Sequence, residues 1–554
     1  MRLNTHTFHY LATLILILTS LLAYSNIIGN DLIGDDKDFI LSWPTIKHLS
    51  NIPQLFSGDV PEQHVGTYRP LRGVFYMLVY QISGEEVWGY HLFSIIIHTL
   101  TTVSVYGLTW QISNRKKLSL TTGLLFSLHP IHTEAITFMT AAFDTPGITM
   151  LFGSIYAFIV GQKSKKTWWS KISVGLALGA YLTNEISLAI VPLIIFYLWI
   201  LNYKKWTKIW KLVKSHIIVT GVYLWLRIYI VNISTRGLYA GGNWYYSYLI
   251  SLKALFMYIY LNIWPQNLNL VHRLPGGFLT YNYYDQTTSI AQQQSWDEPI
   301  IFFIVFIILV SIWLIWRLKQ RQPLISLGIG WFLISLLPVL NILPTAVSFS
   351  ERYAYAASYG FCLLIALVLT SERWNQKKWL QMTLITTILV AYGARTYVRN
   401  FDWKDPITYW EKIVSNYPNH IAAQLNLAQE YQINNRPKEA IQRYQIILDI
   451  KPDFATSYHR IGQINQYYGD FDQAIKAYDQ ALQIEPNLGE TKYYKSMSHY
   501  YLATKLVQEN QPKEAVDQLK IALQLNPLDP DIIQLYQSTC ESIPSHCEVA
   551  PLTR

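Results

Sequence analysis

Charged residues and cysteines are scarce in this sequence. Asp, Glu, Lys and Arg together make up 14% of the 554 residues, whereas ordinary soluble domains carry about 25%. Three cysteines are too few for a disulfide-rich scaffold or a cysteine-rich metal site. No HExxH pattern is present, and the basic residues do not coincide with a nucleic-acid-binding module. We therefore expect no cofactor and no nucleic-acid partner, while a bound divalent metal is left open.

Hydrophobic residues are abundant instead, at 51% of the sequence, and aromatic residues reach 15%. The charge is unevenly divided: residues 402–554 carry 14 Lys and Arg against 19 Asp and Glu, and residues 1–401 carry 30 against 16. An apolar run at 8–23 follows Arg2 without a small-residue cleavage site, which predicts a retained membrane span rather than a signal peptide. We predict an all-α chain with a helical membrane domain at 1–401 and a second helical domain at 402–554.

A helix needs about 20 apolar residues to cross the hydrocarbon core of a bilayer. Two stretches, near 68–82 and 246–265, contain polar residues or prolines, and the sequence leaves open whether they cross. Eleven other stretches are predicted spans: 8–28, 88–110, 118–139, 143–162, 169–184, 187–202, 209–231, 299–317, 323–344, 354–371 and 378–398.

Short basic connectors between these stretches indicate the orientation, because Lys and Arg concentrate in cytoplasmic loops. With eleven spans, all the connectors lie on the cytoplasmic side, whereas a crossing by 246–265 alone would move the last two outside. We therefore predict a multi-pass protein of the cytoplasmic membrane, or of the ER membrane in a eukaryote, with the C-terminal domain outside the cytoplasm. The connectors are Arg115–Lys117, Lys163–Lys171, Lys204–Lys214, Arg317–Arg321 and Arg373–Lys378.

The C-terminal domain has an internal period of 34 residues. Pro452 and Pro486 are one period apart, as are Ala440 and Ala474, and this spacing with small residues at helix crossings is typical of TPR repeats. We predict about three repeats, the last with a longer first helix, preceded by a helix near 406–416. Concave TPR surfaces bind extended partners, and the candidates on this surface are Asn426, Glu430, His459 and Gln463.

Two cysteines near the C-terminus, Cys540 and Cys547, flank Pro544. The proline and the polar residues around it permit a chain reversal, and disulfides persist in compartments outside the cytoplasm. We predict that these two cysteines can form a local disulfide.

Several of the predicted outward loops carry carboxylates and histidines. Asp35 and Asp36 are adjacent just beyond the first span, where one carboxylate can raise the pKa of the other and the pair can act on a hydroxyl group. Ionisable groups near membrane depth are costly and indicate function. The further candidates of this kind are His129, His132 and Glu134 in the stretch LHPIHTEAI, Asp144 at the start of the fourth span, and Glu185 in the next outward turn.

Arginines occur on the same side, at Arg69 in TYRPL, Arg273 in VHRLP and Arg352 in SFSERYAYAAS. A guanidinium group binds phosphate in a bidentate manner, although each arginine alone also fits an anchor at the membrane interface. Carboxylates and arginines that recur on one face favour a functional site over isolated anchors.

The motifs IGDDKDF, YRPL, GYHLFSIIIH, LHPIHTEAI, LPTAVSFSERYAYAASYGFC and RNFDWKDPITYW, followed by TPR units, resemble the transmembrane-and-TPR-containing protein O-mannosyltransferases. The order and spacing agree along nearly the whole chain. The resemblance implies a GT-C-type membrane glycosyltransferase that uses a polyprenyl-phosphate sugar donor. It implies that Asp35 is the catalytic base and Asp36 its partner, with His132, Glu134, Glu351 and Arg352 at the donor pocket.

We therefore predict an inverting transferase that moves a hexose, such as mannose, from the lipid donor to a hydroxyl group of a protein presented by the TPR repeats. The arginines would hold the phosphate of the leaving lipid. The alternative is a non-catalytic membrane-anchored TPR scaffold for assembly of envelope proteins, which explains the repeats but not the outward carboxylates and arginines.

Overall fold

The chain is helical throughout the part that the computed structural model describes, which comprises residues 4–57, 67–201, 205–231, 239, 242–280, 292–340, 347–374 and 376–547. Within these residues only a single bridge, between Arg273 and Leu279, joins extended segments. The predicted all-α class is confirmed. Contacts divide the chain into two compact units, Met1–Tyr409 and Trp410–Arg554.

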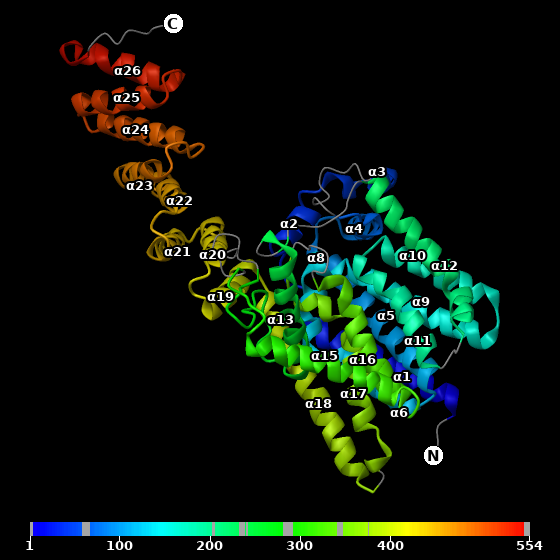
Figure 1. Ribbon diagram of the computed structural model, residues 1–554. Helices are drawn as coiled ribbons and strands as arrows, with labels where there is room; N and C mark the ends of the chain where they lie inside the picture. Colours follow the sequence, from blue (N-terminus) through cyan, green and yellow to red (C-terminus); the bar gives the residue numbers. More distant parts are fainter. Residues whose placement is uncertain are drawn as a thin grey trace. The chain divides into compact units, whose positions relative to one another are not determined.

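The first unit is a bundle of apolar helices, shown in Figure 1. Helices occur at all the predicted spans and at both stretches that were left open, which form α4 (Pro70–Ser83) and α13 (Trp244–Ile263). The others are α1 (Thr5–Tyr24), α5 (Val87–Ser113), α6 (Lys116–Leu128), α9 (Thr145–Ser164), α10 (Thr167–Tyr181), α11 (Ile190–Ile200), α12 (Trp206–Trp225), α15 (Pro299–Leu318), α16 (Pro323–Leu336), α17 (Ser358–Leu369) and α18 (Lys378–Arg399). Connector residues 202–204 and the end of the predicted span at 341–346 lie outside the described residues.

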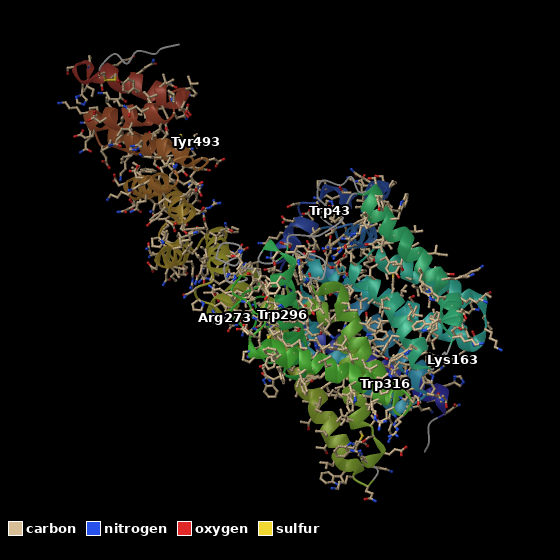
Figure 2. All side chains as sticks on the ribbon, in the orientation of Figure 1. Trp43, Lys163, Arg273, Trp296, Trp316 and Tyr493 are labelled. Carbon is tan, nitrogen blue, oxygen red and sulfur yellow. A yellow bond between two sulfur atoms is a disulfide. The ribbon has the colours of Figure 1, made fainter. Side chains whose placement is uncertain are left out.

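Four of the described segments are long and apolar enough to cross a membrane by themselves: Thr5–Ile27, Val87–Ser113, Met139–Ser164 and Pro299–Leu318. Helix α15 shows the lipid-facing character most clearly, because Phe302, Phe306 and Trp316 are each more than 60% exposed, and Trp316 is labelled in Figure 2. Its 20 residues extend over about 30 Å, the thickness of a hydrocarbon core. The chain is a membrane protein, whereas the count of eleven spans stays a prediction.

The predicted third span, 118–139, is not one continuous helix, so the prediction of a single helix over this stretch was wrong, whereas its crossing of the membrane stays a prediction. Helix α6 ends at Leu128, and Pro130 disfavours the helical conformation at the preceding residue, so His129 is extended with ψ 122°. A short 3-10 turn (Pro130–His132) and helices α7 (Thr133–Thr137) and α8 (Met139–Ala142) follow. Phe138, extended with φ −85° and ψ 110°, separates α7 from α8. This interruption leaves backbone N–H groups of segment 138–140 available for the contacts of the candidate site.

The first loop is folded against the bundle through helix α2 (Asp35–Ile40) and helix α3 (Ile52–Ser57). Gly34 has φ +53° at the residue before α2, a conformation that glycine adopts without steric cost. An aromatic stack fixes the loop, because Phe39 lies parallel to Tyr76 at 5.8 Å and Tyr76 lies parallel to Phe143 at 3.8 Å. Figure 1 shows α2, α4 and α8 together at the end of the bundle away from the N-terminus.

The second unit is an array of antiparallel helix pairs, and the predicted TPR repeats are confirmed. The pairs are α20 (Ile421–Ile433) with α21 (Pro437–Ile450), α22 (Ala455–Tyr467) with α23 (Phe471–Ile484), and α24 (Thr491–Gln508) with α25 (Pro512–Leu525). Helix α19 (Pro406–Asn416) precedes them and α26 (Pro530–Ser542) follows. As predicted, the first helix of the third pair is longer, with 18 residues against 13 in α20 and α22.

Small residues occupy the helix crossings of this array. A Cβ atom at Gly462 would lie 2.5 Å from Cε1 of Tyr478, so no larger residue fits there without a shift of the ring. Ala440 and Ala474, which lie one period apart on the second helices α21 and α23, are fully buried. The predicted bond between Cys540 and Cys547 is present as a disulfide, visible in Figure 2 as a yellow bond beside α26.

Candidate active site

Asp35 and Asp36 occupy contrasting environments although they are adjacent in α2. Asp35 is exposed, whereas Asp36 is buried at 1% exposure. The carboxylate of Asp36 accepts hydrogen bonds from the backbone N–H of Met139 at 3.1 Å and from both the N–H and the hydroxyl of Thr140 at 2.6 and 2.7 Å. Burial raises the pKa of the Asp36 carboxyl to about 7, while these hydrogen bonds act in the opposite direction. Asp36 therefore holds α2 on α8 and leaves Asp35 as the accessible carboxylate.

The segment 138–140 has a second contact, with Arg352. The guanidinium of Arg352 lies 5.7 Å from the ring centre of Phe138, and its Nη1 atom lies 3.6 Å from Glu134. Glu134 also accepts hydrogen bonds from the hydroxyl of Ser350 and from the backbone N–H of Arg352. Since Phe138 directly precedes the two residues that hold Asp36, one short segment places the Asp35 loop and the Arg352 turn next to each other.

Arg69 lies at the centre of a buried ion cluster. Its Nη1 atom donates to both carboxylate oxygens of Asp144 at 2.6 Å, and its Nε and Nη2 atoms lie 2.8 and 2.7 Å from Glu185. The arginine is 7% exposed. The structure thus brings together three residues that the sequence predicted separately. Because its donors are engaged by the two carboxylates, Arg69 joins the starts of α4, α9 and the turn at Glu185.

Two further arginines complete the cluster, and the sequence analysis missed both. Arg72 lies 3.7 Å from Asp144 and stacks over the ring of Phe39 at 4.5 Å, while Arg227 lies 3.1 Å from Glu185. The spacing of three residues between Arg69 and Arg72 places them on one face of a helix, and a charge in the apolar stretch around Arg227 is itself a functional sign. Either signal was available in the sequence.

A cavity of about 20 Å³ lies between the ion cluster and the Arg352 turn. Its lining includes Asp144, Asn184, Arg352 and Tyr353. This volume admits about one water molecule.

Glu351 lies apart from this cluster although it is adjacent to Arg352. It pairs with Arg399 at 2.8 Å, with His272 at 2.8 Å, and with the backbone N–H of Asn269 at 2.5 Å. These contacts tie the segment after α13 to the end of α18. Arg273, next to His272, is exposed. Glu351 thus acts as a buried structural connection, and the phosphate-binding role predicted for Arg273 stays a prediction.

His129 and His132 lie in the core at 0% exposure. His129 contacts the backbone oxygen of Asn262 through Nε2 at 3.1 Å, and His132 contacts the hydroxyl of Ser358 through Nε2 at 2.6 Å. The ring of His132 packs against Phe126, and the ring of His129 packs against Tyr392. Within the described part of the chain, no group of three or more His, Cys, Asp and Glu residues is arranged to hold a metal. The pocket role of these histidines stays a prediction.

The described structure thus combines a bundle of apolar membrane helices, which encloses a buried ion cluster, with a TPR array. A family model described as "Dolichyl-phosphate-mannose-protein mannosyltransferase" matches residues 68–231, and a tetratricopeptide repeat model matches residues 455–488. The first range contains the whole ion cluster, from Arg69 to Arg227. Asp35 and Arg352 lie outside it.

Curated relatives agree with these matches. A protein O-mannosyl-transferase of Caenorhabditis elegans is 25% identical over 469 residues, which cover 80% of this chain and 63% of that protein. The human protein O-mannosyl-transferase TMTC3 is 21% identical over 584 residues, covering 94% of this chain and 60% of that protein. The resemblance to the transmembrane-and-TPR-containing protein O-mannosyl-transferases is confirmed, and the chain spans about three fifths of the length of these relatives. A solved structure titled "Crystal structure of MamA" is 18% identical, covers 28% of this chain and 85% of its own, and has a TM-score of 0.21, too low to bear on the fold.

Proposed function

We propose that the protein transfers mannose from a polyprenyl-phosphate-mannose donor to a hydroxyl group of a protein acceptor. The observation that carries this proposal is the arrangement around segment 138–140. Met139 and Thr140 bind the carboxylate of Asp36, the residue next to the exposed Asp35. Phe138 contacts the guanidinium of Arg352. An inverting transferase needs a base on the acceptor and a cation on the leaving phosphate, and Asp35 and Arg352 match that need. The matching family description names dolichyl-phosphate-mannose as the donor.

In the proposed reaction, Asp35 removes the proton from the acceptor hydroxyl as its oxygen attacks the anomeric carbon of the sugar. The bond from that carbon to the phosphate oxygen breaks, and the lipid phosphate leaves with the bonding electrons. Arg352 stabilises the charge that develops on the phosphate. Asp36 and Arg69 position these groups, because their own polar atoms are occupied by protein contacts. The TPR array presents the acceptor chain.

The membrane arrangement that we propose has eleven spans, with α13 lying along the outer face. Two points on α13, one at its middle and one at its end, contact other helices. Both contacts lie at helix ends that are predicted to face the outer side of the membrane. Lys253 lies 2.7 Å from Glu298, directly before α15, and the backbone oxygen of Asn262 lies 3.1 Å from His129, at the end of α6. A crossing helix would separate its middle and its end by half the membrane. The disulfide at Cys540 and Cys547 further supports a second unit outside the cytoplasm.

Single cysteines at selected sites test this topology. An impermeant thiol reagent on intact cells is expected to label cysteines placed at Asn416 and Glu541, and to leave those at Lys117, Lys166 and Lys378 unlabelled until the cells are opened. The reason is the sorting of the basic connectors to the cytoplasmic side. Labelling at Lys378 together with protection at Asn416 would contradict the arrangement.

The transfer reaction itself is tested with the purified protein, a polyprenyl-phosphate-mannose donor and a serine- and threonine-containing acceptor. Turnover is expected for the parent protein. Arg352→Ala is expected to weaken donor binding by about tenfold or more, since a charge-assisted contact to phosphate is lost. Lys319→Ala serves as the control, because Lys319 lies beyond the cytoplasmic end of α15 in the proposed topology. The absence of turnover by the parent protein would favour the scaffold alternative.

A further inference from the structure

The second unit contains a groove of about 530 Å³ that the proposed reaction leaves without an occupant. It runs over the first helices of the repeats and the start of α23. Helix α24 contributes Tyr494, the residue after Tyr493, which Figure 2 labels. All the lining residues are uncharged: Gln432, Gln463, Gln466, Tyr467, Phe471, Tyr494 and Tyr501.

Two of the glutamines have their amide groups oriented by other side chains. Arg460 donates from Nη1 to the Oε1 atom of Gln463 at 2.8 Å, and the hydroxyl of Tyr478 donates to the Oε1 atom of Gln466 at 2.8 Å. A guanidinium has donors only, so the oxygen of Gln463 must face Arg460. With one hydrogen bond accepted by each oxygen, the NH₂ groups are the donors that these glutamines offer to a ligand. The wall of the groove therefore offers hydrogen-bond donors.

The spacing of these donors suits an extended chain. Gln463 and Gln466 are three residues apart on α22 and share one face, with Cβ atoms about 5–6 Å apart. In an extended polypeptide, the carbonyl groups on one side repeat every second residue, or about 6.8 Å. The flexible ends of the two glutamine side chains can span the difference between the Cβ separation of about 5–6 Å and the carbonyl repeat of about 6.8 Å.

Aromatic rings form the other part of the groove. Phe471 and Tyr501 are stacked with ring centres 5.7 Å apart, and Tyr494 is stacked on Tyr478 at 6.4 Å. Tyr467 is 81% exposed at the edge. Such faces bury small apolar and hydroxyl-bearing side chains at low entropic cost. A terminal carboxylate or a phosphorylated peptide would instead require cations, and the lining contains none.

We propose that this groove binds an extended, uncharged segment of the acceptor polypeptide through its main-chain carbonyl oxygens. Gln463 and Gln466 donate to those oxygens, and the aromatic rings contact the intervening side chains. The inference deepens the proposed function and rests on a protein being the acceptor. On this proposal, the TPR array prefers acceptor segments that are uncharged, and it does not require a particular amino-acid sequence in them.

The test measures binding of a fluorescent peptide of Ser, Thr, Val and Gly to the full-length protein in detergent, by anisotropy and without donor lipid. The double variant Gln463→Glu with Gln466→Glu keeps the accepted hydrogen bonds from Arg460 and Tyr478 but replaces each NH₂ by a carboxylate oxygen. We expect peptide affinity to fall by about tenfold or more, with an unchanged thermal midpoint. Gln480→Glu, which adds one negative charge at an exposed position of α23 outside the groove lining, is expected to leave affinity unchanged.

Three outcomes would overturn the proposal: no peptide binding by the parent protein, equal affinity of the double variant, or tighter binding of a mannose oligosaccharide than of the peptide. The last outcome would assign the groove to a glycan. Peptide binding that is lost in the double variant, in a protein that shows no mannosyl transfer, would support the groove and refute only the proposed function. The experiment can therefore refute peptide binding by the groove and mannosyl transfer independently of each other.

Discussion

Replacing Asp35 with Asn is expected to reduce mannosyl transfer by about 100-fold or more while donor binding and folding persist. Asn keeps the size and most hydrogen bonds of Asp but cannot accept the proton of the acceptor hydroxyl, so the loss should appear in turnover rather than in affinity. Asp35 is exposed, so its replacement should not weaken the fold. Turnover numbers and donor affinity, measured on one preparation, separate these effects.

Asp38→Asn is the matched control, because Asp38 is an exposed carboxylate on the same short helix. It is expected to leave turnover within about twofold of the parent, as is usual for surface positions away from chemistry. Near-parental transfer by Asp35→Asn would place the base elsewhere, with Asp36 and Glu134 as the next candidates. Equal losses in Asp35→Asn and Asp38→Asn would indicate a general effect of charge on α2.

Replacing Arg69 with Met is expected to destabilise the protein by about 3–5 kcal/mol, the usual effect of removing one partner from a buried ion pair. Asp144 and Glu185 would then remain buried, with Arg72 and Arg227 as their nearest cations at 3.7 and 3.1 Å. The thermal midpoint in detergent, followed by gel filtration with fluorescence detection, measures the loss. Lys47→Met, which breaks the exposed pair with Glu85, is expected to leave the midpoint unchanged.

A second variant shows whether charge is the cause. Arg69→Met combined with Asp144→Asn removes one charge of each sign and is expected to recover part of the lost stability. If Arg69→Met instead folds normally and loses only donor affinity, Arg69 is a phosphate ligand, as the sequence alone suggested, and not the centre of a structural cluster. If the double variant is less stable than the single one, packing and not charge explains the effect.

The helical class and the TPR array could be predicted from the sequence because both rest on periodicity. Long apolar runs such as 299–317 leave a helix as the structure that satisfies the backbone within lipid, and α15 indeed begins at Pro299. The period of 34 residues placed Ala440 and Ala474 at helix crossings, where they are fully buried. The apolar runs and the repeat period therefore predicted most of the fold.

The third span and the partners within the site could not be predicted in this way. The run 118–139 is apolar enough for one helix, and only the packing of α7 and α8 shows that Phe138 is extended. The sequence named Arg69, Asp144 and Glu185 but assigned them separate tasks, since contacts over 75 and 116 residues leave no local pattern. Arg72 and Arg227 each had a local signal in the sequence, but their partners Asp144 and Glu185 could not be predicted for the same reason.

The contact between Asp36 and Thr140 also has a consequence for biogenesis. The two residues are 104 positions apart, so in the proposed topology the first loop reaches the outer side of the membrane long before its hydrogen-bond donors have been synthesised. Until helices α5 and α6 are inserted and segment 138–140 follows them, the buried face of α2 stays exposed to water or to chaperones. The site therefore forms late in translation, and an assembly defect in any of these helices would leave a correctly inserted first loop without activity.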